Sequence, residues 1–452
     1  MIALACVALG ALSLLWPGDA PWIFDEPRFF HKALQGIGAA FGLPGTRGFD
    51  MGPFAVWFYG VLLGLTRDLP LIVTIRAALF AAAAIVSLLW LARSCEDLRP
   101  AFAPLALCSF YLFFYSRILW DTFYFPLSAL CIASYVSFCV KREGWKLWIT
   151  TLAGVCLVLT HLMGLVVTLP IAAHFLWLHW RWLVERPKLL CALAAAKLAL
   201  IAPYAFHLIT TPRYSIDMPS YSAWKGFLFP LFGCRLFSAQ GLDYFLGDQW
   251  KSGAAAAVTV VAYPLAWAGM ALCVRTLIEG IGDSKKCDGD FHMAGLALAS
   301  LATQCVVFGI MRAYEHPHYL GPGWLFSFYF IWTALSEASR RWGAWADTLA
   351  GVYGVSLTAV LVGTIVTLHH DGGNRSMHYG ETLGNQIEVA RALQAYTPGP
   401  IDIQVRHDQV VPEALTTLME VYGLKTEAGA PSRKLAIVYD GQGGRIKLVA
   451  RD

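Results

Sequence analysis

The chain has 452 residues, of which 57% are hydrophobic and 14% charged, and its mean hydropathy is +0.55. This balance excludes an ordinary water-soluble globular protein and indicates a protein embedded in a lipid bilayer. The formal net charge of +4 is small, and no run of lysine and arginine is long enough to follow a nucleic acid, so nucleic acid is excluded as a partner.

Eleven apolar stretches approach the length of about 20 residues that a helix needs to cross a hydrocarbon core about 30 Å thick. The first stretch has no basic residues before it and no small-residue cleavage pattern, so we expect a retained helix and not a signal peptide. Residues 52–65 are apolar but too short to span, and are expected to lie at the membrane surface or to re-enter the membrane. The predicted spans are residues 1–16, 69–92, 101–115, 122–140, 147–162, 166–182, 189–209, 254–278, 291–311, 319–336 and 345–368.

The orientation of the chain follows from the basic residues in short loops, because loops rich in lysine and arginine stay in the cytoplasm. Alternate loops carry the basic clusters, which places the N-terminus in the cytoplasm and the C-terminus outside. The other loops, including residues 17–68, 116–121 and 312–318, then lie outside. The basic residues are Arg93, Arg99, Lys141, Arg142, Lys146, Arg181, Arg186, Lys188, Lys285, Lys286, Arg340 and Arg341.

The last 84 residues differ in kind from the apolar region, residues 1–368, because residues 369–452 hold 19 charged residues against 45 in the whole region before them. Their pattern predicts helices at 381–396 and 412–422 and strands at 401–405, 435–439 and 446–449. The predicted fold is therefore an all-α polytopic membrane protein with a small extracytoplasmic C-terminal α/β domain, whose role is structural or in acceptor recognition.

Most of the eleven cysteines fall in apolar stretches, and no Cys-x-x-Cys pair occurs. We interpret these thiols as small buried hydrophobic side chains. They are Cys6, Cys108, Cys131, Cys139, Cys156, Cys191, Cys273 and Cys305.

Acidic and basic residues meet directly after the first helix, in Asp25-Glu26-Pro27-Arg28 and in His31-Lys32. Pro27 suits the first turn of a helix, so Arg28 and His31 or Lys32 would share a face with the acids. A carboxylate that loses hydration near the lipid has a raised pKa and is a stronger general base. The alternative is a solvated cluster of charges at the membrane surface.

Four segments resemble, in order, the GT-C superfamily of membrane glycosyltransferases that use polyprenyl-phosphate sugars, which includes protein O-mannosyltransferases and aminoarabinose transferases. They are Asp-Glu-Pro-Arg at residues 25–28, the aromatic segment at 49–59, Ser-Arg-Ile-Leu-Trp-Asp at 116–121, and His-Pro-His-Tyr-Leu-Gly-Pro at 316–322. Relatives often carry Lys-Pro-Pro where this chain has Met51-Gly52-Pro53, and Lys-Gly where it has residues 161–164. Another cation must therefore meet the donor phosphate.

The resemblance implies an inverting glycosyltransferase that moves a sugar from a polyprenyl-phosphate donor to a glycan, lipid or protein acceptor, on the outer side of a bacterial inner membrane. Asp25 would be the general base, with Glu26 as its partner or substitute. Arg28 and Arg117 would bind the leaving phosphate. The remaining predicted substrate-binding residues are Asp50, Tyr59, Asp121, His161, His318 and Tyr319.

Structural interpretations of these residues stay open. Arg117 can extend to the membrane surface, and Asp121 can close a helix end with an ion pair instead of contacting the sugar or orienting Arg117. Oxygen and nitrogen ligands lie on the predicted outer side in Asp50, His161, His316 and His318, but their spacing matches no metal motif. We assign no metal, and the expected chemistry requires no cofactor.

The competing function is a transporter or flippase for a lipid-linked saccharide. Such a protein places ionisable residues along a path through the bilayer. Here charged residues are nearly absent from the centres of the predicted spans, with Lys197 the main exception, and no internal repeat is found. This pattern favours chemistry at the membrane surface. A third function, a membrane scaffold for the C-terminal domain, would not require the outer-loop motifs.

Overall fold

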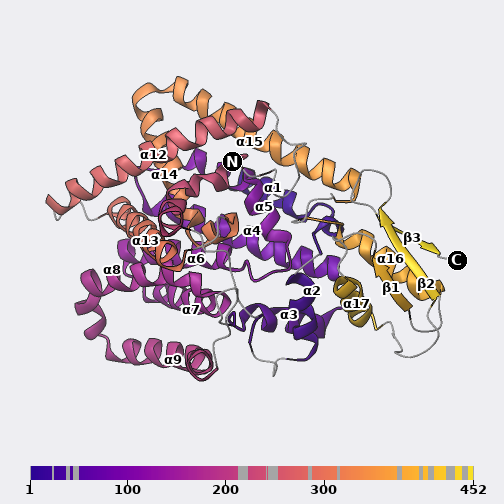
Figure 1. The fold of residues 1–452 in the computed structure, drawn as a ribbon. Helices are drawn as coiled ribbons and strands as arrows, with labels where there is room; N and C mark the ends of the chain where they lie inside the picture. Colours follow the sequence, from indigo (N-terminus) through magenta and orange to yellow (C-terminus); the bar gives the residue numbers. More distant parts are fainter. Residues whose placement is uncertain are drawn as a thin grey trace.

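A computed structural model gives the fold (Figure 1). The structure describes residues 2–22, 25–36, 41–43, 50–211, 222–240, 242, 253–282, 288–312, 316–373, 379–396, 401–405, 412–423, 433–439 and 446–450.

Seven of the predicted spans are helices that are long and apolar enough to cross a membrane, which agrees with an all-α polytopic membrane protein. They are α4 (Leu69–Ser94), α6 (Tyr124–Lys141), α8 (Leu165–Val184), α9 (Pro187–Thr210), α12 (Gly253–Gly282), α13 (Gly289–Met311) and α15 (Ala344–Asp371).

The other four predicted spans are also helical, but in different forms. Three are the short α1 (Ile2–Ala11) followed by η1 (Leu12–Leu14), the 17-residue α7 (Gly144–Thr160), and α14 (Trp324–Trp342), which is mostly buried and follows η9 (Pro317–Gly323). A total of eleven crossings stays a prediction.

The fourth, residues 101–115, was predicted as one helix, and this is wrong. It is divided into η4 (Pro100–Cys108) and α5 (Phe110–Arg117). Pro104 has no N–H to donate, and Ser109 between the two pieces has an extended backbone. The Ser109 hydroxyl accepts a hydrogen bond from the backbone N–H of Leu112 at 3.3 Å, so a new helix begins there.

Short elements connect the spans on the side where the four motifs lie. They are η2 (Pro17–Asp19), α2 (Asp25–Leu34), α3 (Phe54–Leu65), η5 (Leu162–Gly164), α10 (Ala223–Leu228) and η6 (Phe229–Phe237). Helix α2 begins with two acids and ends with His31 and Lys32, an order of charges that complements the helix dipole. Helix α3 has 12 residues, as expected of an apolar segment too short to span, and its place relative to the membrane stays a prediction.

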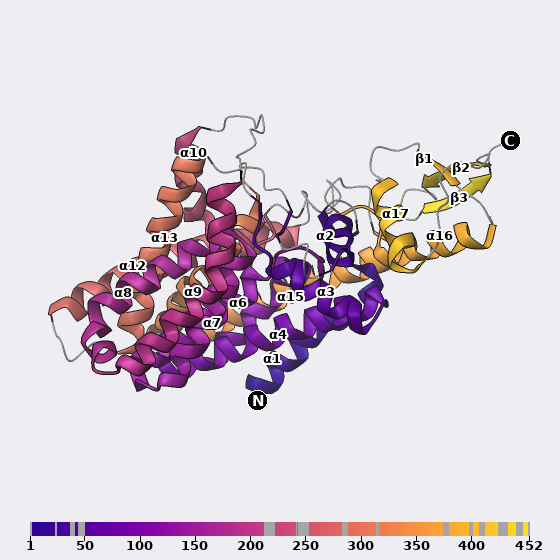
Figure 2. The same cartoon turned by 90° about the horizontal axis from the view of Figure 1, so that it is seen from below.

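The C-terminal segment forms α16 (Leu383–Tyr396), β1 (Ile401–Val405), α17 (Pro412–Val421), β2 (Arg433–Tyr439) and β3 (Ile446–Ala450). The strands make a sheet of order β1-β2-β3, in which β1 and β2 are parallel and β2 and β3 antiparallel. Figure 2 shows the N-terminus at the lower edge of the molecule, with α2, α17 and the strands above it. That residues 369–452 form a separate extracytoplasmic domain stays a prediction.

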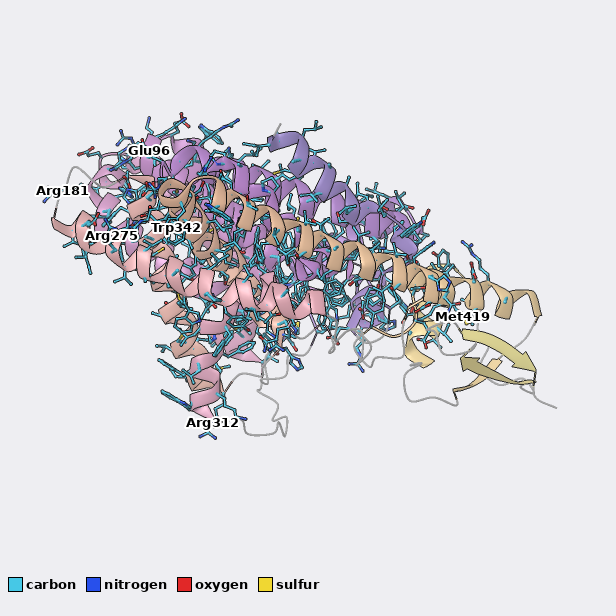
Figure 3. All side chains as sticks on the ribbon, turned by 90° about the horizontal axis from the view of Figure 1, so that it is seen from above. Glu96, Arg181, Arg275, Arg312, Trp342 and Met419 are labelled. Atoms are coloured by element: carbon cyan, nitrogen blue, oxygen red, sulfur yellow. The ribbon has the colours of Figure 1, made fainter. Side chains whose placement is uncertain are left out.

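The ends of helices that carry predicted cytoplasmic charges meet one another. Arg99 lies 2.9 Å from Asp347 at the start of α15, and Arg340 at the end of α14 forms an ion pair with Asp97. In Figure 3, Arg181 and Arg275 lie toward this end of the bundle, and Arg312 lies at a distant end. The loops that carry Arg99, Arg181 and Arg340 therefore share one face, as the alternation of basic residues predicts. Lys285 and Lys286 lie outside the described residues, and which face is cytoplasmic stays a prediction.

Candidate active site

The turn after α5 is held by Arg76, a buried residue of α4 with 1% of its surface exposed. Its guanidinium donates to the carbonyl oxygens of Tyr115 at 2.8 Å and Ser116 at 2.5 Å, and to the hydroxyl of Thr122. The last carbonyl groups of a helix have no partner within that helix, so one buried arginine satisfies the end of α5 and positions the segment that follows.

Tyr59 connects the short helix α3 to the same turn. Its side chain is fully buried, and its hydroxyl donates a hydrogen bond of 2.8 Å to the carbonyl oxygen of Trp120. The predicted substrate-binding residue Tyr59 therefore lies beside the predicted residue Asp121, although 61 positions separate Tyr59 from Trp120 in the sequence.

Asp121 is a buried carboxyl group with 6% exposure. Burial, followed by the negative charge of Asp25, raises its pKa to about 8, against an opposing effect of the Arg76 cation. At neutral pH Asp121 is therefore mostly an uncharged acid, able to donate a hydrogen bond. Asp25 and Asp121 come from separate motifs, and this effect shows that they lie close enough for their charges to interact.

The acids of α2 differ in exposure. The Asp25 side chain is 32% exposed, and its carboxylate lies 3.8 Å from the guanidinium of Arg28, which is 53% exposed. Glu26 is buried, with 1% exposure, and lies within electrostatic range of Tyr59. The accessible acid is thus Asp25, the one predicted to act as the base, while Glu26 faces the protein.

Aromatic and imidazole rings connect the motif at residues 316–322 to this turn. The His318 ring lies 5.5 Å from that of Trp120 and 4.2 Å from that of Tyr319. The Tyr319 ring is 6.4 Å from that of His161, whose Nδ1 accepts a hydrogen bond of 3.0 Å from the backbone N–H of Met163. Burial lowers the pKa of His161 to about 4, so its ring is neutral.

Asp50 belongs to a neighbouring arrangement. Its carboxylate lies 2.8 Å from Nε2 of His207, and its carbonyl oxygen accepts a hydrogen bond of 2.8 Å from the Tyr204 hydroxyl. The charge of Asp50 partly offsets the lowering of the Lys32 pKa, which burial causes. Asp50 is thus 19% exposed and engaged by α9, and its contact with substrate stays a prediction.

Arg117 points toward the first loop and the C-terminal segment. It is 3% exposed, and its guanidinium donates to the carbonyl oxygen of Trp16 and lies over the Phe113 ring at 4.8 Å. Burial lowers its pKa, and the nearby Tyr379 and Asp19 oppose that effect. A phosphate-binding role for Arg117 stays a prediction.

Several buried polar atoms around the turn have no hydrogen-bond partner within the described residues. They are Nε of Arg76, Nε of Arg117, Nε1 of Trp120 and Oδ2 of Asp121. An unsatisfied buried polar group costs about 1–3 kcal/mol, so such atoms seldom gather by chance. These atoms, together with the approach of Asp25, Tyr59 and His318 to the same segment, mark this turn as the centre of the candidate site.

Arg76 is not among the predicted site residues, although the sequence contains a signal for it. An arginine inside an apolar spanning helix is costly unless it has a partner, and this residue lies in the predicted span 69–92. What the sequence did not reveal is the identity of its partners, because they come from the turn about 40 residues later.

Comparisons with known proteins bear on the fold. No family model matches the sequence, and no curated protein matches it. The crystal structure of ArnT from Cupriavidus metallidurans in the apo state has a TM-score of 0.56 and 14% identity, over 99% of this chain and 97% of that one. The same ArnT bound to undecaprenyl phosphate has a TM-score of 0.52 and 13% identity, over the same shares. The chain therefore shares the fold of ArnT along nearly its whole length, and the predicted resemblance to that group is confirmed at the level of the fold.

Proposed function

We propose that this protein is an inverting glycosyltransferase that moves a sugar from a polyprenyl phosphate to an acceptor. The observation that carries the proposal is the convergence of motifs: Asp25, Tyr59, Asp121 and His318 come from four distant segments and surround one turn. The ArnT-like fold supports a transferase that uses a lipid-linked sugar, and one of the two ArnT structures contains undecaprenyl phosphate.

The donor is a sugar carried on a single polyprenyl phosphate. Its apolar tail suits the grooves between spanning helices, and its phosphosugar head suits a polar site where helices end. The turn carrying Asp121 lies between α5 and α6, at an end of the bundle. An uncharged Asp121 is compatible with an anionic phosphate, whereas an ionised one would repel it.

In the proposed reaction, Asp25 removes a proton from a hydroxyl or amine of the acceptor. The acceptor atom then forms a bond to the anomeric carbon from the face opposite the phosphate, and the carbon–oxygen bond to the phosphate breaks. The phosphate leaves with the electron pair, and the configuration at the anomeric carbon inverts. Arg28, one helical turn from Asp25, is the proposed cation for the developing charge, with Arg117 as a second contact.

The remaining predicted residues would contact the sugar or the phosphate. His318 and Tyr319 offer hydrogen-bond donors beside Trp120. The ring of His161 lies next to that of Tyr319. Protonated Asp121 would donate to the donor phosphate or to the sugar. Glu26 would act on the site through its charge near Tyr59. Asp50 would take part through its contact with His207.

The test is the Asp25→Asn variant in a transfer assay with a purified polyprenyl-phosphate sugar donor. Asparagine keeps the shape of the side chain and removes its basicity, so we expect transfer to fall by at least 100-fold, since general-base catalysis contributes about 10²–10⁴-fold. Asp371→Asn, which changes a carboxylate at the end of α15 that pairs with His370, is the matched control and should keep full activity.

Transfer by Asp25→Asn at the wild-type rate would remove the base from the mechanism. Movement of the intact lipid-linked saccharide across vesicles by both wild type and Asp25→Asn, without transfer, would favour the competing transporter or flippase.

We further propose a bacterial inner-membrane location with the N-terminus in the cytoplasm and both the site and the C-terminal segment in the periplasm. The alternation of basic loops supports this orientation. Alkaline phosphatase fused after Asp452 should be active in intact cells, because that enzyme folds only outside the cytoplasm. An inactive fusion of full length would reverse the orientation.

A further inference from the structure

Three imidazoles and a thiol meet inside the helix bundle, away from the candidate active site. Cys139 comes from α6, His174 and His179 from α8, and His292 from α13. Within the part of the chain that the structure describes, Cys139, His174 and His179 form the one group of three or more potential metal ligands whose donor atoms all lie within 4.8 Å of one another.

The spacing of these atoms suits a tetrahedral ion. Nε2 of His179 lies 3.3 Å from Sγ of Cys139. A zinc ion with a Zn–S distance of about 2.3 Å and Zn–N distances of about 2.0–2.1 Å would hold sulfur and nitrogen about 3.5 Å apart. Small rotations of the side chains would therefore suffice to bring three donor atoms onto one ion.

His292 of α13 lies beside this group, although its donor atoms are not within 4.8 Å of all three others. Its ring centre lies 5.2 Å from that of His174 and 6.1 Å from that of His179. The side chain is 4% exposed, and its Nδ1 has no hydrogen-bond partner among the described residues. A movement of this side chain toward His174 would be needed to bring a fourth donor from a third helix onto the ion.

Burial makes this cluster costly without a ligand. His179 is 1% exposed, and Nε2 of His174 likewise lacks a partner within the described parts of the chain. The other nitrogen of His174 lies 2.8 Å from the hydroxyl of Tyr135. A metal-binding histidine commonly uses its second ring nitrogen in such a hydrogen bond, which fixes the orientation of the ring.

The cluster is separate from the transferase site. Asp121 precedes the first residue of α6, whereas Cys139 lies near the last, and helix geometry puts about 22 Å between Tyr124 and Cys139. The cluster shares its end of the bundle with Arg142, which lies within electrostatic range of His292. An ion here would join three helices and take no part in sugar transfer.

We infer that Cys139, His174 and His179 bind one borderline-soft transition-metal ion of the zinc class, with His292 as the fourth ligand, and that this ion clamps α6, α8 and α13 together. A thiolate with imidazoles is the ligand set that such ions prefer over Mg²⁺ or Ca²⁺. On binding, the Cys139 thiol gives its proton to water, and the thiolate sulfur donates an electron pair to the ion.

The test uses full-length protein, purified in detergent through a tag without histidine, stripped with EDTA and then dialysed against Zn²⁺ or Co²⁺. We expect about one metal ion per chain, a near-ultraviolet band from thiolate bound to Co²⁺, and a rise of several degrees in the melting temperature with Zn²⁺. Cys139→Ala should remove the band, and His179→Ala should weaken Zn²⁺ binding at least tenfold. Cys305→Ala changes a buried thiol of α13 outside the cluster and is the matched control.

Stoichiometry near zero in the wild type, or equal metal binding by Cys139→Ala and Cys305→Ala, would overturn the inference. If Cys139→Ala does not fold, the wild-type Co²⁺ spectrum still decides, because a spectrum without a thiolate band excludes the cysteine ligand. All of these readouts are independent of transfer activity.

Discussion

The hydroxyl of Tyr59 donates a hydrogen bond of 2.8 Å to the carbonyl oxygen of Trp120, so that the short helix α3 holds the turn that carries Asp121. The Tyr59 side chain is fully buried, and loss of its hydroxyl removes this partly buried hydrogen bond. We expect Tyr59→Phe to lower the free energy of unfolding by about 1–3 kcal/mol and also to reduce transfer, because the turn loses its anchor.

Tyr353→Phe separates these two effects. The Tyr353 hydroxyl donates a hydrogen bond of 2.5 Å to the carbonyl oxygen of Phe237, in the helix bundle. This variant should lose similar stability but keep its transfer rate when assayed below its melting temperature. Equal losses of transfer in the two variants would mean that Tyr59 has no special role at the turn.

The raised pKa of Asp121 predicts a pH dependence of transfer. Burial and the charge of Asp25 raise this pKa to about 8, so the carboxyl group ionises as pH rises through that value. The new charge would repel Asp25 and the donor phosphate, and transfer should decline above pH 8. Asp121→Asn stays uncharged at every pH and should keep activity without this decline. A decline of the same shape in both proteins would assign it to another group.

The same group affects stability, with a defined sign. The unfolded carboxyl group ionises near pH 3.8, while the folded one holds its proton up to about pH 8. Its contribution to stability is therefore full below about pH 4 and is lost as pH rises to about 8. Melting temperatures at pH 5 and pH 8 should differ more in the wild type than in Asp121→Asn.

Trp22 and His31 both join the N-terminal segment to α17, but with unequal strength. The fully buried Trp22 donates from Nε1 to the carbonyl oxygen of Ala414 at 3.0 Å. The His31–Glu420 pair, at 2.9 Å, is about half exposed on both sides. Trp22→Ala should cost about 3–5 kcal/mol, because a large buried side chain is lost. His31→Ala should cost about 0–1 kcal/mol, as exposed ion pairs do.

Limited proteolysis of the C-terminal segment measures this difference. Cleavage should be much faster in Trp22→Ala and nearly unchanged in His31→Ala. If transfer also falls in Trp22→Ala, the packing of the C-terminal segment against α2 supports Asp25. Rapid cleavage of His31→Ala would show that the surface pair dominates, against expectation.

The sequence predicted much of the architecture because apolar length and basic loops are local signals. All eleven apolar stretches are helical, and residues 25–28, 116–121 and 316–322 meet, as their predicted shared sidedness requires. The division of residues 101–115 was missed, although Pro104 marks it. The periodicity of apolar residues therefore predicts helices more reliably than it predicts the breaks within them.

Contacts between distant residues could not be predicted in the same way. The partners of Arg76 lie about 40 positions away, and the approach of Asp25 to Asp121 depends on how α2 packs. The cluster of Cys139, His174 and His179 was not predicted because His174 and His179 are five residues apart, a spacing that puts them on different faces of an ideal helix. Only the packing of α6 and α13 against α8 brings Cys139 and His292 beside the two histidines of α8.

Gly52 tests the close packing of the segment before α3 against the end of α7. A Cβ atom at Gly52 would lie 1.8 Å from the carbonyl oxygen of Leu159, near the end of α7, and backbone cannot move aside as a flexible side chain can. Gly52→Ala should therefore push the segment before α3 away from the turn that carries His161, lower the melting temperature and reduce transfer severalfold.

Gly64→Ala is the control, since a Cβ at Gly64 in α3 meets nothing within 4 Å. That variant should be neutral or more stable by about 0.5–1 kcal/mol, because alanine loses less backbone entropy in a helix. If Gly52→Ala has the melting temperature and the transfer rate of the wild type, the close approach of these two segments does not shape the site.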